Sequence, residues 1–333
     1  MRKCVVLCRA LLGGLLLTTA NVYAGERQIS LDWLKVVAFA AHQTEYSGIF
    51  VYQYDNRVET SRITHLVEPD SEYEKLESLD GPKREIIRHH GQVWCYTNHK
   101  MLQIDSQQGR RKFPFLLPEQ LTALSENYQI KEAGVERVAG YNAQVIVFEP
   151  RDNLRYTHKI WAHSDSGLLL KAAVVGDKNR VVEQYAFTQL QIGGNIDRSW
   201  IGLTTSRADP APAKQEGGLP PVPSDIIKGS AAINSGWVVD GIPAGFKKTM
   251  EILRPMRGKH APVTQIVFSD GLSAVSIFIE PADEDEDDVE GLSNRGAVNL
   301  YHKIVDDHLI TVVGEVPPRT VMRALNSIRY NGK

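Results

Sequence analysis

The sequence predicts an α+β protein: a large curled antiparallel sheet with helices on its inner face, followed by a smaller α+β domain. Many apolar, strand-like segments joined by short turns precede residue 206, a Pro- and Gly-rich stretch follows, and a second mixed set of strands and helices ends the chain. Strands joined by short turns form an antiparallel meander. Because a twisted sheet curls beyond about ten strands, we expect a curled sheet that encloses an apolar space.

Residues 1–24 have the pattern of a cleaved secretory signal peptide. Basic residues open the segment, an apolar core spans residues 10–20, and Val22-Tyr23-Ala24 offers small residues at the positions that a signal peptidase inspects. An uncleaved anchor is disfavoured, because the apolar run is shorter than the about 20 residues that span a bilayer. We therefore expect a protein of the periplasm.

Cysteine content and charge argue against an intramolecular disulfide and against a nucleic-acid partner. Loss of the leader would leave Cys95 as the single cysteine, so an intramolecular disulfide is not expected. Cys95 lies in an apolar strand and is predicted to be a small buried hydrophobe rather than a nucleophile. The leader carries three basic and no acidic residues, so its loss moves the formal charge from −2 to about −5. With no basic stripe, a nucleic-acid partner is disfavoured.

The first domain, residues 25–205, is predicted to open with a helix. Ser30 is a suitable N-cap, and Leu31, Leu34, Ala38 and Ala41 follow at helical spacing. The strands that we expect after it are 46–54, 58–67, 72–79, 84–88, 93–97, 101–104, 135–139, 143–149, 155–162, 168–175 and 181–192, with a short helix at 118–124.

Residues 206–232 are predicted to form an extended linker between the two domains. Proline has no amide for a sheet ladder, and the stretch lacks an apolar period. The second domain, residues 233–333, is expected to hold strands at 237–240, 246–253, 262–269, 272–280, 297–305 and 309–315, and a final helix at 320–328. Six consecutive acidic residues, 283–288, are expected to lie in a loop, because like charges repel.

The usual catalytic and metal-binding motifs are missing from this sequence. It has no nucleophile elbow, phosphate-binding glycine loop, His-Glu-x-x-His or pair of Cys-x-x-Cys motifs, which lowers the expectation of an enzyme. His89-His90 with His99 is a poor metal candidate, since neighbouring residues on a strand point to opposite faces. The acidic run lacks the glycine and the spaced ligands of a calcium loop. We expect neither a metal nor a cofactor.

An ordered set of motifs resembles the RseB/MucB family of periplasmic sigma-E factor regulators, over nearly the whole mature length. The matching segments are Tyr46–Tyr52, Arg62–His65, Glu74–Gly81, Arg84–Arg88, Val138–Tyr141, Tyr156–Trp161 and Ser166–Leu170 in the first domain, and Phe268–Glu280 and Thr311–Pro317 in the second. Single pieces are weak signals, but the ordered set is specific. The six-acid run is not part of the family pattern.

The resemblance implies a fold and a function. The first domain would be similar to the lipoprotein carriers LolA and LppX, a half-open barrel with an apolar cavity. The second domain, with the linker, would bind the periplasmic part of a transmembrane anti-sigma factor of the RseA/MucA type and shield it from site-one proteolysis. Lipopolysaccharide or mislocalised lipoprotein would release it. The alternatives are a lipid carrier of the LolA type, which needs only the first domain, and an envelope-lipid hydrolase, for which no nucleophile is identifiable.

Two sets of residues are candidates for the site. Aromatic residues on curled strands can bury acyl chains, with ordinary core as the alternative role; the cavity candidates are Tyr46, Phe50, Tyr52 and Trp161. Strands of the second domain could accept an added strand from a disordered partner, or simply pair within their own sheet. The partner-binding candidates are Ser269, Asp270, Gly271, Leu272, Val275, Ile277, Tyr301 and Val313. Lipid and partner are expected to be coupled through the inter-domain face. The oligomeric state is left open.

Overall fold

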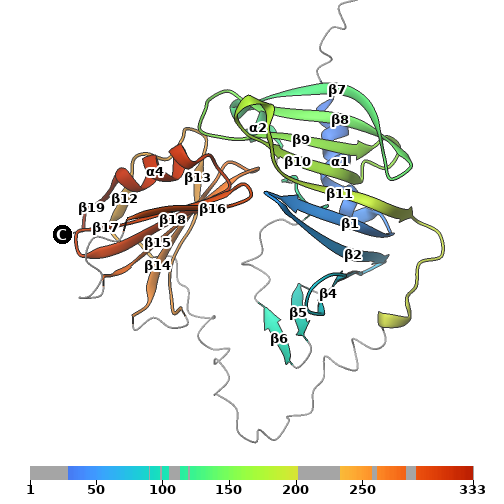
Figure 1. Cartoon of the computed structure of the whole chain (residues 1–333), viewed down its shortest axis with the longest axis horizontal. Coiled ribbons are helices and arrows are strands. Elements are labelled where there is room, and N and C mark those ends of the chain that lie inside the picture. Colours follow the sequence, from blue (N-terminus) through green and yellow to red (C-terminus); the bar gives the residue numbers. More distant parts are fainter. Residues whose placement is uncertain are drawn as a thin grey trace, which may run out of the picture.

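The computed structural model of this chain describes residues 29–89, 91–97, 100–104, 113–118, 121–201, 233–256, 261–282 and 290–332 (Figure 1). The predicted signal peptide and linker lie outside these ranges, as do the six-acid run, His90 and His99. Within the described ranges, no helix is both long and apolar enough to cross a membrane.

An eleven-stranded antiparallel sheet dominates the first half of the chain. Its spatial order is β6-β5-β4-β3-β2-β1-β11-β10-β9-β8-β7. The strands are β1 Tyr46–Tyr54, β2 Arg57–Glu68, β3 Ser71–Ser78, β4 Arg84–His89, β5 Gln92–Thr97, β6 Lys100–Ile104, β7 Tyr128–Val138, β8 Tyr141–Pro150, β9 Thr157–His163, β10 Leu169–Val175 and β11 Val181–Ile192. β6 and β7 are the two edges of this order, so the sheet curls without closing into a barrel. The predicted fold class is confirmed.

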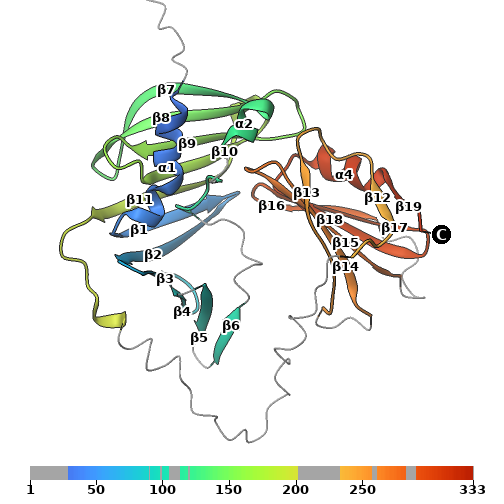
Figure 2. The same ribbon diagram turned by 180° about the vertical axis from the view of Figure 1, so that it is seen from behind.

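Helices pack on the inner face of this sheet. Helix α1, Leu31–Gln43, starts at the predicted N-cap Ser30, whose side chain accepts a hydrogen bond from the Asp32 amide. Figure 2 shows α1 crossing in front of the strands. Its apolar side, including Leu34 and Val37, joins the main core of the first domain. Helix α2, Thr122–Asn127, starts four residues later than predicted and packs against β7.

Two smaller apolar clusters cover the outer face of the sheet. Ile196 and Trp200, which follow β11, pack over Leu66 of β2, Tyr73 of β3 and Ile87 of β4. A separate cluster on β8, β9 and β10 consists of Ala143, Val145, Trp161, Leu170 and Ala173. The inner and outer faces are therefore both apolar over part of their area.

A six-stranded antiparallel sheet forms the body of the second half. Its order is β13-β14-β15-β18-β17-β16. The strands are β13 Lys247–Arg254, β14 Val263–Ser269, β15 Ala274–Pro281, β16 Gly291–Arg295, β17 Val298–Val305 and β18 His308–Gly314. Helix α4, Pro318–Asn326, covers one face through Val321, Ala324 and Leu325. A two-stranded ribbon of β12, Trp237–Val239, and β19, Ile328–Tyr330, completes it. β16 and β19 were not predicted.

Candidate functional site

Three of the four predicted cavity residues lie together on the inner face. Strand β1 places Tyr46, Phe50 and Tyr52 on one side by simple alternation. Phe50 pairs across the ladder with Phe187 of β11, and Tyr52 with Tyr185. Tyr46 is fully buried, and burial raises the pKa of its phenol well above the usual range. The inner face of β1 and β11 is therefore a continuous aromatic surface.

Trp161 lies on the other face of the sheet, so it does not share one surface with Tyr46, Phe50 and Tyr52. In the ladders, Trp161 pairs with Lys171 of β10, and Lys171 pairs with Ala186 of β11. Ala186 pairs with Val51 of β1, which points to the opposite face from Tyr52. Trp161 therefore lies on the face of Val51. The indole Nε1 donates to Glu136 at 2.7 Å. The ammonium groups of Lys159 and Lys171 lie 4.6 and 4.4 Å from the ring centroid, within cation–π range.

The aromatic surface on the inner face is covered by the chain's own residues 113–118, Phe-Pro-Phe-Leu-Leu-Pro. The Phe113 ring lies parallel to Tyr185, with centroids 5.5 Å apart and planes 10° apart. It also contacts Phe50 at 5.4 Å and Phe187 at 5.1 Å between centroids. Phe113 is 4% exposed. No element was predicted for residues 113–117, and the short helix predicted at 118–124 begins at the last residue of this segment.

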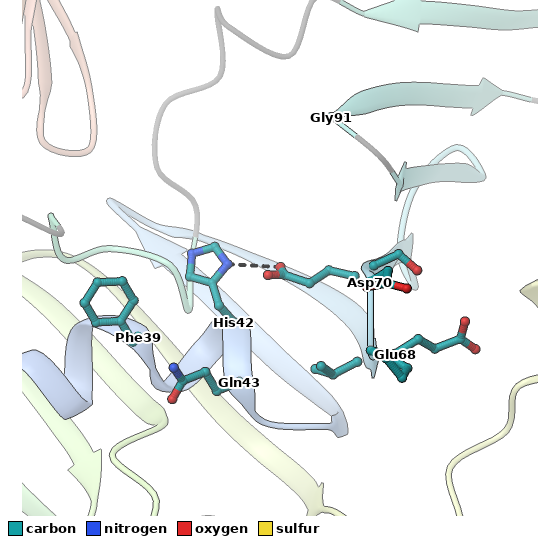
Figure 3. A pocket seen from close by; sticks show the side chains of 10 residues that line it. Phe39, His42, Gln43, Glu68, Asp70 and Gly91 are labelled. Carbon is teal, nitrogen blue, oxygen red and sulfur yellow. Dashed lines mark hydrogen bonds and ion pairs between the residues drawn. The ribbon is translucent and has the colours of Figure 1, made fainter.

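An open pocket of about 960 Å³ adjoins this segment (Figure 3). The lining comes from the end of α1, the turn between β2 and β3, and the turn before β5: Phe39, His42, Gln43, Val67, Glu68, Pro69, Asp70, Ser71, Glu72 and Gly91. His42 Nδ1 lies 3.0 Å from Glu72 Oε2, and the Phe115 ring packs on His42 at 4.7 Å between centroids. The pocket is thus part apolar and part acidic.

Histidine contacts set the charge of this pocket. His65, whose Nε2 lies 3.6 Å from Glu72 Oε2, and then His42, at 3.0 Å, lower the pKa of Glu72, although burial opposes them. The buried His65 ring also bonds the Thr44 carbonyl through Nδ1 at 2.8 Å. Among the residues that the structure describes, no group of three His, Cys, Asp or Glu side chains has a metal-binding arrangement.

A buried polar cluster joins the two halves of the chain at Asp270. This carboxylate accepts hydrogen bonds from Arg155 Nε at 2.7 Å and from the Tyr128 hydroxyl at 2.9 Å. Arg155 also bonds Asp152 and the Ala244 carbonyl. Burial lowers the pKa of Arg155, but the bond and charge of Asp270 more than offset this, so its pKa is raised. Burial, with the nearby Asp270 charge, raises the pKa of Tyr128.

Further polar contacts cross the same interface. Asn299 Nδ2 donates to the Tyr156 hydroxyl at 3.0 Å, and the Ala297 amide donates to Glu183 at 3.0 Å. The Thr320 hydroxyl donates to the Leu154 carbonyl at 2.8 Å. Leu272, beside Asp270, packs against the core of the first domain. The predicted inter-domain face is therefore a bonded interface with a buried ion pair.

The predicted partner-binding residues lie at the domain interface or within the sheet of the second domain. Asp270, Gly271 and Leu272 face the first domain of the same chain. Val275, Ile277 and Tyr301 are buried in the core of the second domain. The flanking positions Ser269 and Val313 are half-buried and paired with Ala274 and Ser276 of β15 respectively.

The strands that carry these candidates are also internal. β15 pairs with β14 and β18, and β17 pairs with β18 and β16, so their backbones are used within the sheet. Of the two possibilities weighed from the sequence, pairing within the sheet is the one that the structure has. The edges of this sheet are β13 and β16.

Comparison with known proteins identifies the family. Residues 30–204 match the MucB/RseB N-terminal domain and residues 231–329 the MucB/RseB C-terminal domain. The chain is 32% identical over 326 residues to the sigma factor AlgU regulatory protein MucB of Pseudomonas aeruginosa, covering 96% of this chain and 95% of that protein.

Solved structures agree with the sequence match. The complex of Pseudomonas aeruginosa MucA/MucB superposes with a TM-score of 0.71 at 29% identity, covering 91% of this chain and 99% of that one. A crystal structure of MucB gives a TM-score of 0.59 at 28% identity, covering 90% and 97%. With both of its halves matched in order and nearly its whole length aligned, this chain belongs to the MucB/RseB family.

Proposed function

We propose that this protein is a periplasmic negative regulator of a sigma-E-type envelope-stress response. It binds the periplasmic part of a transmembrane anti-sigma factor and shields it from site-one proteolysis. The observation that carries the proposal is the full-length match to MucB, whose solved complex contains MucA. The TM-score is higher for that complex than for the crystal structure of MucB, 0.71 against 0.59. This difference supports the described domain arrangement as the one competent to hold the partner.

The partner segment adds as an extended strand to β16. An unpaired sheet edge offers amide and carbonyl groups to an incoming chain. β13, the other edge, already receives a backbone hydrogen bond from Ile233 to the Glu251 carbonyl at 3.2 Å. β16 is largely exposed, and Arg295 at its end reaches Glu59 of the first domain at 3.0 Å. A partner strand on β16 therefore lies beside both domains.

The test uses the mature full-length chain and the periplasmic fragment of its anti-sigma factor. We expect the two to elute together on size exclusion, and the fragment to resist the site-one protease only when the chain is present. Hydrogen exchange should then slow at the amides of 291–295 and stay unchanged at 247–254, which serves as the internal control. Failure to co-elute would refute the regulator; co-elution with protection at 247–254 alone would refute the β16 site.

A lipid or a lipoprotein acyl chain is the proposed release signal, and it binds at the aromatic inner face. Phe50, Tyr185 and Phe187 supply apolar surface worth about 25 cal/mol per Å² buried. A carrier of the LolA type is disfavoured, because the second domain is bonded to the first through the buried Arg155–Asp270 pair. Transfer of stoichiometric lipid from the purified chain to acceptor vesicles would favour the carrier instead.

A further inference from the structure

We propose that residues 113–118, which we call the plug, are a built-in occupant of the inner face, and that an acyl chain binds there by displacing them. The proposal rests on the proposed function in taking an acyl chain as the ligand. Beyond that function, the proposal names the segment that the ligand displaces. It also names the contacts through which this displacement affects the second domain.

Within the part of the chain that the structure describes, the plug contributes no strand to the sheet and contacts it through buried apolar side chains. Phe113 is enclosed by three rings of the sheet, and Leu117 is buried beside them in the main core. Two of its six residues are prolines, which have no amide to donate. The backbone hydrogen bond that the structure shows within the plug is internal, from the Leu116 amide to the Pro114 carbonyl at 3.1 Å.

An acyl chain is the kind of ligand that replaces such an occupant. Because the plug contributes no strand to the sheet, its departure leaves the ladders of β1 and β11 intact. The incoming chain restores the lost apolar contacts with Phe50, Tyr185 and Phe187. The open pocket of about 960 Å³ is lined by His42, on which Phe115 of the plug packs, and it is the proposed point of entry for the ligand.

The far end of the plug touches the domain interface. A Cβ placed on Gly271 would lie 3.5 Å from Cγ of Pro118 and 3.2 Å from Cδ2 of Leu124, so the turn of the second domain rests directly on the plug and on α2. Tyr128, which follows α2, donates to Asp270. Plug, helix and buried ion pair thus form one continuous path from the ligand surface to the second domain.

Displacement of the plug then weakens the binding of the anti-sigma factor. A ligand shifts a conformational equilibrium only when it binds the two arrangements unequally. Here the acyl chain requires the plug to be out, whereas the described domain interface includes Pro118 of the seated plug. The two binding events are therefore antagonistic, and the anti-sigma fragment weakens acyl-chain binding by the same factor.

The main test compares the full-length chain with Phe113→Ala, using palmitoyl lysophosphatidylethanolamine as the probe. The probe binds only those molecules in which the plug has left the inner face. Its apparent affinity for the chain is therefore its intrinsic affinity multiplied by the fraction of such molecules. Removing the Phe113 ring should raise that fraction, and we expect the probe to bind about tenfold more tightly. Tyr73→Ala, which removes a buried ring from the outer face, is the matched control and should bind the probe as the native chain does.

Hydrogen exchange on the native chain provides a second readout that needs no variant. With the probe bound, amides in 113–118 and 121–128 should exchange faster, while those of β1 and β11 slow or stay unchanged. Phe113→Leu, a milder change, stands in should Phe113→Ala fail to fold. Equal probe affinity in native and Phe113 variants, or probe binding without faster exchange in the plug, overturns the proposal. Failure of every variant to bind the anti-sigma fragment would instead overturn the proposed function.

Discussion

Arg155 and Asp270 form an ion pair across the domain interface, with Nε and Oδ2 2.7 Å apart and side chains 1% and 0% exposed. Charges buried to this degree are stable only when paired and hydrogen-bonded. The Tyr128 hydroxyl of the first domain also donates to Asp270, and the Ala244 carbonyl of the second domain accepts from Arg155. The pair therefore favours this arrangement of the two domains, because Arg155 and Asp270 come from different domains and compensate each other's charge here.

Replacing Asp270 with Asn should loosen the two domains. The amide removes the charge opposite Arg155. Its single oxygen can replace only one of the two carboxylate oxygens, of which Oδ2 accepts from Tyr128 and Oδ1 from the Ser273 amide. Loss of one member of a buried pair costs about 3–5 kcal/mol, and we expect about 3 because Arg155 retains Asp152. Calorimetry should show a lower melting temperature, with the unfolding of the two domains separating into two transitions.

Asp240→Asn is the control for this prediction. Asp240 pairs with Arg329 at 2.8 Å within the second domain, but both side chains are more than half exposed. Exposed pairs contribute about 0–1 kcal/mol, so this variant should melt nearly as the native protein does. Equal effects of the two substitutions would show that the Arg155–Asp270 pair has no special role.

Local alternation correctly predicted which residues of β1 share a face of the sheet. The period of two in β1, ended by the turn at Asp55-Asn56, placed Tyr46, Phe50 and Tyr52 on one face, as found. The face on which Trp161 lies could not be predicted in this way. Strand β9 buries three consecutive residues, Ile160 to Ala162, so burial there does not indicate the face. The sheet is covered on both sides at that point.

Strand order and contacts between residues far apart in the chain could not be predicted from the sequence. β18 lies between β15 and β17, an order that turns and periodicity do not reveal, and it makes the predicted docking strands internal. Asp270 was singled out, but its bonds to Tyr128 and Arg155 join positions more than a hundred residues apart. The plug has the composition of a buried segment with no period, so only the fold shows what it covers.

Acidification should weaken the same interface through His158. Burial lowers the pKa of His158 from 6.5 to about 4, against a smaller opposing effect of the Asp270 charge. Between these values the unfolded chain binds a proton that the folded chain excludes. The contribution to stability is therefore complete above pH 6.5 and is lost as the pH falls toward 4.

The size and the test of this effect follow from the surroundings of His158. The ring faces the Tyr128 ring, the Ser273 hydroxyl at 3.4 Å and the Asp270 charge, and it keeps partial exposure. We expect a loss of about 1–2 kcal/mol, below the roughly 3 of the full shift. Urea unfolding at pH 7 and pH 4.5 should show a smaller loss in His158→Gln. His163→Gln, on the same strand, should retain the native pH dependence.

Gly271→Ala should disturb the contact between the second domain and the plug. Its φ of +102° is rare for residues with a Cβ, and the added methyl would press on Leu124 and contact Pro118. Gly140→Ala is the matched control, since its φ is +90° but a Cβ there meets nothing within 4 Å. Both should lose about 1–3 kcal/mol to backbone strain. Only Gly271→Ala should also weaken co-elution with the anti-sigma fragment; equal weakening in both would argue against the contact.

Phe50 and Trp161 should differ in their effect on acyl-chain binding, because they lie on opposite faces of one sheet. Phe50→Leu removes a ring from the inner face, next to Phe113 and Phe187. Trp161→Phe keeps an aromatic side chain on the outer face and loses the bond to Glu136. We expect the first to change the affinity for palmitoyl lysophosphatidylethanolamine several-fold and the second to leave it unchanged, as measured by titration calorimetry. A change in Trp161→Phe alone would move the ligand to the outer face, where Lys159 and Lys171 flank the indole, and would exclude the inner face as the lipid site.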